Sequence, residues 1–327
     1  AVMLNVIPSI ISMLMVLVYN LADTFFIGQT KNAYMVAAVS LATPAFLLFM
    51  AVGMLFGIGG TSLISRLMGE GKRDRATHAC SFCFWTSSAA GIVGMLIIFF
   101  GAEPVARIVG ATPDTFDYVV EYLKIVAIGI PFLVIGNAFS SIIRAEGKAG
   151  KAMAGMIIGN LANIILDPIM NVGGAAAATT IGNVLSAIFY IAHFVSGKST
   201  LSINPKFYKA GEGIAKGVLA IGVPASLNSM LMSASNVVIN NLMTTHGDMA
   251  VAGLGVAMKV NMIAVMLLIG LGTGIQPLLG YNFGAGNRQR FKSVLKFSLV
   301  LAVSLSIVMT IICYAFAGPM AGDSGLL

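Results

Sequence analysis

The sequence predicts an all-α integral membrane protein, with nine spanning helices in this chain. Three observations predict this class: 58% of the 327 residues are hydrophobic, only 9% are charged, and the mean hydropathy is +0.94. Soluble domains average about 25% charged residues. Apolar stretches of this chain repeatedly reach the ~20 residues that a helix needs to cross a hydrocarbon core about 30 Å thick. The composition therefore excludes a soluble protein that carries a single anchor.

The predicted spans follow one another along the chain, each as an apolar stretch of helical length between polar connections. They cover roughly residues 2–27, 34–67, 77–100, 118–143, 151–170, 173–196, 214–243, 250–282 and 291–317. The second and the eighth are longer than a bilayer requires, so we expect them to tilt or to extend beyond it. The connection DPIMNVGGAAAA, before the sixth span, is unusually tight.

The positive charges are divided unevenly between the two sides of this predicted bundle. With the N-terminus placed inside, 15 of the 19 lysines and arginines fall on the inner side. The outer connections hold Lys31 and Arg107, while Lys124 and Lys259 fall within spans. By the positive-inside rule, this asymmetry predicts a multi-pass protein of the cell's inner (cytoplasmic) membrane with a cytoplasmic N-terminus. The net charge of +7 therefore reflects orientation and predicts no nucleic-acid partner.

The chain contains an internal repeat, in which residues 57–75 correspond to residues 272–290. Six positions match, and all are glycine or arginine: Gly57 with Gly272, Gly59 with Gly274, Gly69 with Gly284, Gly71 with Gly286, Arg73 with Arg288, and Arg75 with Arg290. Upstream, Pro8 aligns with Pro224 after a shift of one residue. Spans one to three therefore recur as spans seven to nine. Because each repeat holds an even number of spans, the repeats are parallel, as in many transporters.

This period predicts two lobes joined by a linker. We expect an N-terminal six-helix lobe at residues 1–197, a cytoplasmic linker at 198–213, and the first three helices of a C-terminal lobe at 214–327. A second repeat of equal size would add about three more spans. We therefore expect this chain to be part of a longer protein.

Two of the twelve carboxylates, Asp23 and Asp167, fall inside hydrophobic spans. An acid at membrane depth costs several kcal/mol unless it is protonated, paired or hydrated, so it usually marks an ion or proton pathway. Asn20 precedes the first by three residues and Asn163 precedes the second by four, so each pair shares a helix face. Thr179 enters at comparable depth from the sixth span. The alternative is that both acids only cap helix ends or contact interfacial water.

We predict that these five residues bind a proton or an oxygen-seeking cation such as Na⁺. A sodium ion would take its ligands from four of them: Asp23, Asp167, Asn163 and Thr179. The ionisable site is predicted in the first lobe only, because Ile239 stands at the repeat equivalent of Asp23. Two asparagines keep the second lobe polar and are candidates for lining a substrate cavity: Asn236 and Asn240. Lys259 either joins that lining or extends its ammonium group to the membrane surface.

Five stretches of the sequence carry a resemblance to a known family: YNLADTFFIGQ, GEGKRDRA, RAEGKAGKAMAGMIIGNLANIILDPIM, GGAAAATTIGNVLSAIFY and PLLGYNFGAGNRQR. Together they resemble the multidrug and toxic compound extrusion (MATE) family, in particular its DinF-like prokaryotic branch. The resemblance implies twelve helices in two six-helix lobes, which form a V around a central cavity with alternating access. It implies the coupling role for Asp23 and Asp167. Asn163 and Thr179 match the accompanying polar positions, and Asn137 matches more loosely as a cavity residue.

The leading hypothesis is a secondary active antiporter that exports organic cations or amphipathic compounds in exchange for H⁺ or Na⁺, as a monomer in the lipid bilayer. The alternative is a lipid-linked oligosaccharide flippase of the same superfamily. A flippase needs several cavity cations to hold a pyrophosphate, whereas only Lys124 and Lys259 fall within spans. No nucleophile–base pair, histidine cluster or metal motif predicts an enzyme or a bound cofactor. We expect His193, near the inner end of the sixth span, to be interfacial.

Overall fold

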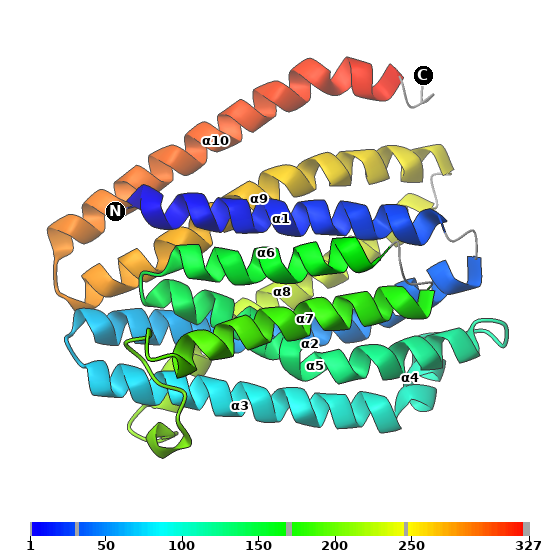
Figure 1. Ribbon diagram of the computed structural model, residues 1–327. Helices are drawn as coiled ribbons and strands as arrows, with labels where there is room; N and C mark the ends of the chain where they lie inside the picture. The colour runs from blue at the N-terminus through cyan, green and yellow to red at the C-terminus, as the bar shows by residue number, and fades with distance from the viewer. Residues whose placement is uncertain (1, 30–32, 168–171, 245–247, 323–327) are drawn as a thin grey trace.

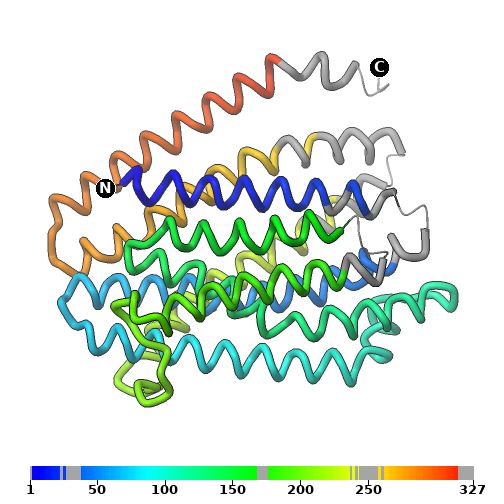
Figure 2. Tube along the Cα trace, viewed as in Figure 1, coloured from blue at the N-terminus to red at the C-terminus, as the bar shows by residue number. Residues whose placement is uncertain are grey.

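The computed structural model describes residues 2–29, 33–167, 172–244 and 248–322 (Figures 1 and 2). Within these ranges, some side chains lie outside the description: those of residues 23–24, 27–29, 33–37, 172–175, 236–237, 240–241, 243–244, 248–256, 259–260 and 316–322. The described residues form helices and turns, with no β-strand among them. The predicted all-α membrane class is confirmed.

Nine long helices account for the predicted spans, and within the described residues each is apolar enough to cross a membrane. They are α1 (Val2–Gln29), α2 (Ala33–Gly69), α3 (Arg73–Phe100), α5 (Phe116–Ala145), α6 (Ala149–Leu166), α7 (Val172–Val195), α8 (Ile214–Thr244), α9 (Asp248–Gly284) and α10 (Arg288–Gly322). Two short helices in connections were not predicted: α4 (Ala102–Ile108) and the 3₁₀ helix η1 (Pro205–Phe207). The fifth span was predicted as residues 151–170; α6 ends at Leu166 with Asp167 as its C-cap, and residues 168–170 lie outside the described residues.

Glycines in the left-handed conformation follow three of the long helices at one end of the bundle. Gly71, Gly147 and Gly286 have φ values of 75°, 78° and 66°, a conformation that costs glycine little because it has no Cβ. After α2, the Lys72 N–H donates to the Leu67 carbonyl at 2.9 Å, and the other two turns contain the equivalent bond. This bond satisfies one of the last carbonyls of each helix. Since Gly71 and Gly286 are repeat equivalents, both repeats carry the same turn.

Helix α5 lies at the centre of the part of the bundle formed by α1–α7. Within α5, 67% of the most apolar stretch is buried. The helix packs against α2, α3 and α7. Helix α1 contacts α6 and also α9, so it lies between the first helices and the later ones (Figure 1). Helix α8 packs on α2. Helix α10 lies at the edge, with 6% of its most apolar stretch buried.

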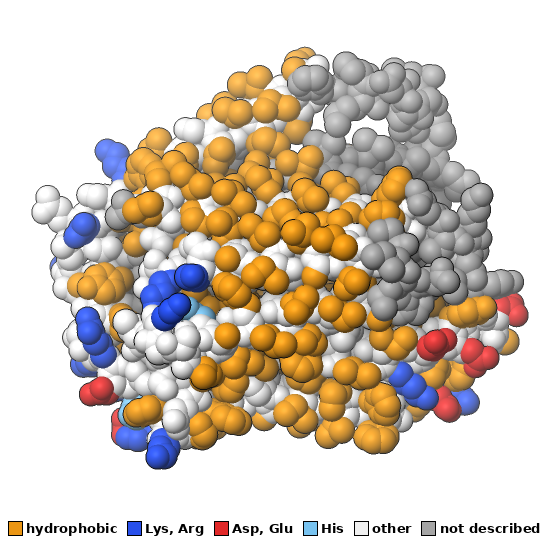
Figure 3. All heavy atoms as spheres, viewed as in Figure 1, with side chains coloured by type: hydrophobic (Ala, Val, Ile, Leu, Met, Phe, Trp, Pro, Cys, Tyr) orange, Lys and Arg blue, Asp and Glu red, His pale blue; other side chains and the backbone are white. Residues whose placement is uncertain are grey.

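Charged side chains gather at the two ends of the bundle, and a broad hydrophobic belt covers the side between them (Figure 3). Lysines and arginines gather at the end that carries the α2–α3, α5–α6 and α9–α10 turns and residues 198–213. We call this end the basic end. Acidic side chains gather at the opposite end, where α4 lies. This distribution follows the charge asymmetry read from the sequence, and the assignment of the basic end to the cytoplasm stays a prediction.

Candidate functional site

Helices α6 and α7 approach each other so closely that their backbones touch. A Cβ added to Gly159 would lie 2.6 Å from the Gly182 carbonyl oxygen, and a Cβ added to Gly182 would lie 2.6 Å from the Gly159 carbonyl oxygen. Glycine at both positions allows this approach. The Ser186 hydroxyl then reaches across and donates to the Gly155 carbonyl at 2.9 Å. These contacts set which side chains of the two helices face each other one turn farther from the basic end.

Three of the predicted coupling residues meet on this α6–α7 interface. Asn163 donates from Nδ2 to Asp167 Oδ2 at 2.9 Å, and its Oδ1 accepts from the N–H and the hydroxyl of Thr179 at 2.9 and 3.0 Å. This amide orientation is assigned from its partners, because amide oxygen and nitrogen are hard to distinguish directly. Asn163 and Asp167 are buried, with 2% and 6% of their surface exposed. A carboxylate at the end of α6 is thus linked through one amide to α7.

The α1 half of the predicted coupling site is described only in part. Asn20 is half-buried on α1, and α1 packs along α6. The side chain of Asp23 lies outside the described residues, so its pairing with Asp167 stays a prediction. The side chains of three predicted cavity residues also lie outside the description: Asn236, Asn240 and Lys259.

Asn137, the remaining cavity candidate, is half-buried between α5 and α2. Its Nδ2 donates to the Leu133 carbonyl of its own helix at 3.0 Å. A Cβ added to Gly53 of α2 would lie 2.8 Å from the Asn137 Cβ, so glycine leaves the room that this side chain occupies. Asn137 therefore packs against α2. Lys124, one of the two cations predicted within spans, is exposed on α5.

A pocket of about 560 Å³ lies between α9, α10 and the part of α2 nearest the basic end. Apolar side chains such as Leu271, Ile275 and Leu299 form most of its lining, and Arg66 and Gln276 add polar groups. None of the predicted coupling or cavity residues is among the described residues that line it. The described lining also contains no carboxylate, so nothing in it indicates a site where acids bind a coupling cation.

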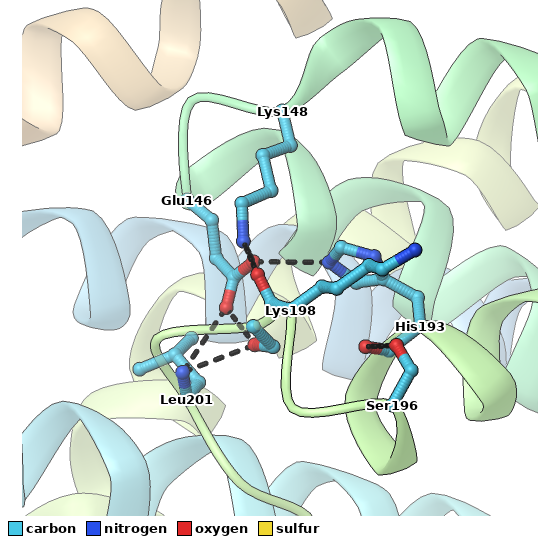
Figure 4. A network of polar contacts seen from close by, with 7 residues as sticks. Glu146, Lys148, His193, Ser196, Lys198 and Leu201 are labelled. Carbon is cyan, nitrogen blue, oxygen red and sulfur yellow. Dashed lines mark hydrogen bonds and ion pairs between the residues drawn. The ribbon is translucent and has the colours of Figure 1, made fainter.

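Sequence reasoning missed a second buried carboxylate, which lies at the basic end (Figure 4). The Glu146 side chain follows α5 and has none of its surface exposed. Its Oε2 accepts from Lys148 Nζ at 3.0 Å and contacts His193 Nε2 at 3.3 Å. Its Oε1 accepts from the Ser199 hydroxyl and, at 3.2 Å, from the Leu201 N–H. These groups come from three segments of the chain, and they compensate a charge that burial would otherwise penalise.

This network shows how two polar residues at the basic end are placed. Glu146 lies in the connecting segment after α5, and its side chain is buried there. His193 lies at the end of its span, as expected, but only 8% of its surface is exposed, because it packs against Glu146. The partners of Glu146 lie between 2 and 55 residues away in sequence. No local motif therefore signals the network, although an acid and a histidine at two neighbouring span ends are a weak hint.

The predicted linker, residues 198–213, is hydrogen-bonded to α3. Three side chains of α3 donate to backbone carbonyls of this segment: Ser81 to Asn204 and Trp85 to Ile203, both at 3.0 Å, and Arg75 to Glu212 at 2.6 Å. The chain then turns away into α8 through Glu212 and Gly213, whose φ values are 55° and 79°. The linker is therefore held on α3 up to the residues that immediately precede α8.

Comparisons with known proteins agree on one family. The MatE family model matches residues 8–169 and 224–322, which together exceed half of the chain. The chain is 33% identical over 315 residues to the multidrug export protein MepA of Staphylococcus haemolyticus, covering 94% of this chain and 70% of that protein. It is 32% identical over 315 residues to MepA of Staphylococcus aureus, with 93% and 70% covered.

A solved structure shows the same fold over nearly the whole chain. It is described as the outward-facing conformation of a multidrug resistance MATE family transporter of the MOP superfamily. The two structures superpose with a TM-score of 0.93 at 25% sequence identity, covering 98% of this chain and 72% of that one. The two stretches that the family model matches begin at Pro8 and Pro224, positions that the internal repeat pairs.

Proposed function

This chain belongs to the MATE family, and on that premise we propose that it is a secondary active multidrug exporter that exchanges organic cations or amphipathic compounds for H⁺. It is a multi-pass membrane transporter and not an enzyme. We further propose that it works as a monomer in the cell's inner membrane. The basic end and the N-terminus then lie in the cytoplasm, since 15 of the 19 cations gather on that side.

The observation that carries this proposal is the buried contact of Asp167 with Asn163. An ionised carboxylate at membrane depth costs several kcal/mol. The Asn163 amide reduces this penalty by donating to Oδ2 at 2.9 Å, but an amide is neutral and leaves the charge in place. Protonation removes the charge. The free energy of enclosing Asp167 between helices therefore depends on whether a proton is bound, and that dependence is what a coupled transporter requires.

Asn163 supports a path by which the protonation of Asp167 reaches α7. With Asp167 ionised, the amide directs Nδ2 to the carboxylate and Oδ1 to the Thr179 N–H. A protonated Asp167 donates its own O–H and is better matched by the amide oxygen. In that reversed orientation, Nδ2 donates to the Thr179 hydroxyl at 3.0 Å, and the Thr179 N–H no longer has the amide oxygen as acceptor. The hydrogen bonds that join α6 to α7 through this amide therefore differ between the two protonation states of Asp167, which supports a response of α7 to the proton.

Na⁺ is the competing candidate for the coupling ion. A sodium ion needs oxygen atoms directed toward it, and Asn163 directs its amide oxygen toward Asp167 only when the amide is reversed from the assigned orientation. The efflux experiment therefore compares the two ions.

In the proposed cycle, an external proton neutralises Asp167 and, by the sequence prediction, Asp23. Neutral acids allow the cavity to close on the outer side and to open at the basic end. A cationic compound then competes for the ionised carboxylates or for the conformation that they favour. The name of the relatives, multidrug export protein, supports a broad range of such compounds. A flippase is less well supported, because a pyrophosphate needs several cavity cations and only Lys124 and Lys259 fall within spans.

Efflux of ethidium from energised cells that express the protein tests the proposal. We expect efflux to stop when an ionophore collapses the pH gradient, and to be independent of external sodium. We expect Asp23→Asn and Asp167→Asn each to abolish efflux at normal expression, because an amide does not bind and release a proton at physiological pH. Glu103→Gln is the matched control, since Glu103 is an exposed acid in α4. Unchanged efflux in both aspartate variants, or efflux driven by sodium alone, would contradict the assignment.

A further inference from the structure

The linker, residues 198–213, carries basic and aromatic side chains that the proposed transport cycle does not use. Lys206 and Lys209 are exposed. Between them in sequence, Phe207 and Tyr208 keep 40% and 43% of their surfaces exposed. The linker contains three lysines and one acid, so it is positively charged. Aromatic rings and lysines side by side are typical of the boundary between the hydrocarbon and the headgroups of a membrane.

This part of the linker is folded onto α3 rather than projecting from the bundle. His78 Nδ1 lies 2.9 Å from the Phe207 carbonyl oxygen, and the two rings lie 6.1 Å apart. The Tyr208 ring lies 5.9 Å from the ring of Phe82. His78, Phe82 and Trp85 are spaced four and three residues apart, so they share the face of α3 that the linker covers. Both aromatic side chains of the linker therefore pack on α3 while part of their surface stays exposed.

Trp85 lies where the linker meets the hydrophobic belt. Its indole N–H donates to the Ile203 carbonyl at 3.0 Å, and 40% of the residue is exposed. Farther along α3, the large exposed side chains are apolar, as at Ile92 and Leu96. In the other direction, His78 lies seven residues nearer the basic end, about 10 Å along the helix. The lysines of the linker therefore lie at the level of headgroups when Trp85 lies at the hydrocarbon boundary (Figures 1 and 3).

The charges of this surface are largely left for a partner outside the chain. No described ion pair involves Lys206. Lys209 Nζ lies 3.7 Å from Glu212 Oε1, but both side chains are about half exposed, and water screens a pair of this kind. The adjoining first turn of α3, residues 73–76, contains two arginines and one acid. The surface is therefore complementary in charge to an anionic partner.

We propose that the surface formed by Trp85, Lys206, Phe207, Tyr208 and Lys209 binds the headgroups of anionic phospholipids, and we call it the linker surface. This inference goes beyond the transport function and does not depend on it. A lysine near an anionic membrane surface increases binding about fivefold, and the aromatic rings favour the layer just below the headgroups. A soluble acidic partner fits less well, because the exposed rings adjoin the hydrophobic belt. Lipid bound here holds the linker against the membrane.

Quenching of Trp85 by brominated lipids measures this binding. Trp85 is the single tryptophan of the chain, so its emission reports on the linker surface. The protein is placed in bilayers of phosphatidylcholine and phosphatidylglycerol, in which one lipid or the other carries brominated acyl chains. We expect phosphatidylglycerol to bind beside Trp85 at least about fivefold more tightly than phosphatidylcholine. Salt at about 1 M should reduce this preference, because it screens the charges.

A pair of double variants separates the linker surface from the general charge of the basic end. Lys206→Gln with Lys209→Gln removes two charges from the surface, and we expect Trp85 to be quenched about equally by the two lipids. Lys292→Gln with Lys296→Gln is the matched control, since it removes two exposed charges from α10 at the same end. We expect the control to keep the full preference. An unchanged melting temperature shows that each variant is folded.

Equal quenching by the two lipids in the unaltered protein would overturn the proposal. So would a preference that survives in the linker variant, or one that falls as far in the α10 variant. Quenching of Trp85 by iodide and by neither lipid would show that the surface faces water and suits a soluble partner, which would also overturn it. Ethidium efflux is a separate measurement: its absence would contradict the proposed function and leave this inference standing.

Discussion

Two turns at the basic end share the sequence Glu-Gly-Lys and the same local conformation, yet differ in what covers them. Residues 70–72 follow α2 and residues 146–148 follow α5. The glycines have φ values of 75° and 78°, and the lysine ammonium contacts the glutamate at 2.7 Å in the first turn and at 3.0 Å in the second. The first glutamate keeps 30% of its side-chain surface exposed, whereas the second keeps none.

The difference shows that the sequence of a turn sets its backbone conformation but not how much its ion pair contributes to stability. An exposed ion pair contributes between about 0 and 1 kcal/mol, because water screens it. Around Glu146, however, α7 supplies His193 and the linker supplies Ser199 and Leu201. Removing one member of a buried charged group costs about 3–5 kcal/mol, because the other members are left uncompensated. The same tripeptide is therefore a surface pair after α2 and an anchor for the linker after α5.

The largest expected effect comes from removing the buried carboxylate. We expect Glu146→Ala to lower the free energy of unfolding by about 3–5 kcal/mol, and Glu70→Ala to lower it by at most about 1 kcal/mol. Thermal unfolding in detergent measures both. The emission of Trp85, the single tryptophan, should also shift to the red in Glu146→Ala, because its indole N–H contacts the linker at Ile203. Equal destabilisation by the two substitutions would show that the cover over the second turn has no energetic consequence.

A smaller contrast is expected between the two lysines. Lys148 Nζ donates to Glu146 and also to the Lys198 carbonyl of the linker, at 2.6 Å, whereas Lys72 is half-exposed. Hydrogen bonds that involve a charged group contribute about 1.5–3 kcal/mol, so Lys148→Ala should destabilise by about that amount. Lys72→Ala should stay within about 1 kcal/mol. Thermal unfolding in detergent measures both variants. A larger loss of stability in Lys72→Ala than in Lys148→Ala would contradict this prediction.

A still smaller effect is expected from the linker side of the network. Ser199→Ala removes one neutral donor to Glu146 Oε1, while the Leu201 N–H, Lys148 and His193 stay in place. We expect a loss of about 1 kcal/mol and a partial red shift of Trp85 emission. Ser202→Ala is the matched control, because the hydroxyl of Ser202 accepts only from the neighbouring Asn204 N–H among its described contacts. An unchanged melting temperature in Ser199→Ala would show that the Ser199 hydroxyl does not help to hold the linker on Glu146.

The smallest expected effect is the acid sensitivity of the exposed turn. The hydrogen bond from Lys72 holds the pKa of Glu70 below its ordinary value of 4.5, against desolvation, and the charges of Lys72, Arg66 and Arg75 lower it further. Since the folded pKa lies below the unfolded one, this contribution is complete above pH 4.5 and disappears as the pH falls through the folded pKa. Glu70→Gln should therefore alter the melting temperature only slightly at neutral pH, and should leave no pH-dependent contribution from this turn in acid. A Glu70→Gln variant that lost stability relative to the unaltered protein mainly in acid, and not at neutral pH, would contradict this account.

The spans and the family were predictable because their signals are carried by stretches of sequence. Each of the nine spans was found within a few residues, since apolar length is a property of one segment. The grouping of Asn163 with Asp167 was also predictable, because a spacing of four places both on one helix face. Thr179 was placed beside them by depth, and the α6–α7 contact does bring it there. The coupling role of these residues stays a prediction.

Other features required the folded chain. The short helix α4 lies in a connection whose composition does not distinguish a helix from a loop. The gathering of Lys148, His193, Ser199 and Leu201 around Glu146 joins segments that no periodicity relates. The internal repeat showed that Gly69 and Gly284 are equivalent, but it did not show that each lies against the other helix.

The sequence by itself determined the membrane class, the number and order of the spans in this chain, the side on which the cations gather, and the presence of two acids within apolar stretches. Each of these depends on the composition of a contiguous segment. Only the tertiary structure decided that Glu146 is buried while Glu70 is exposed, that one amide links α6 to α7, and that Gly69 and Gly284 lie where α2 meets α9. These outcomes depend on how far each helix is rotated and how deeply it is inserted beside its neighbours, which is settled when all the helices pack together.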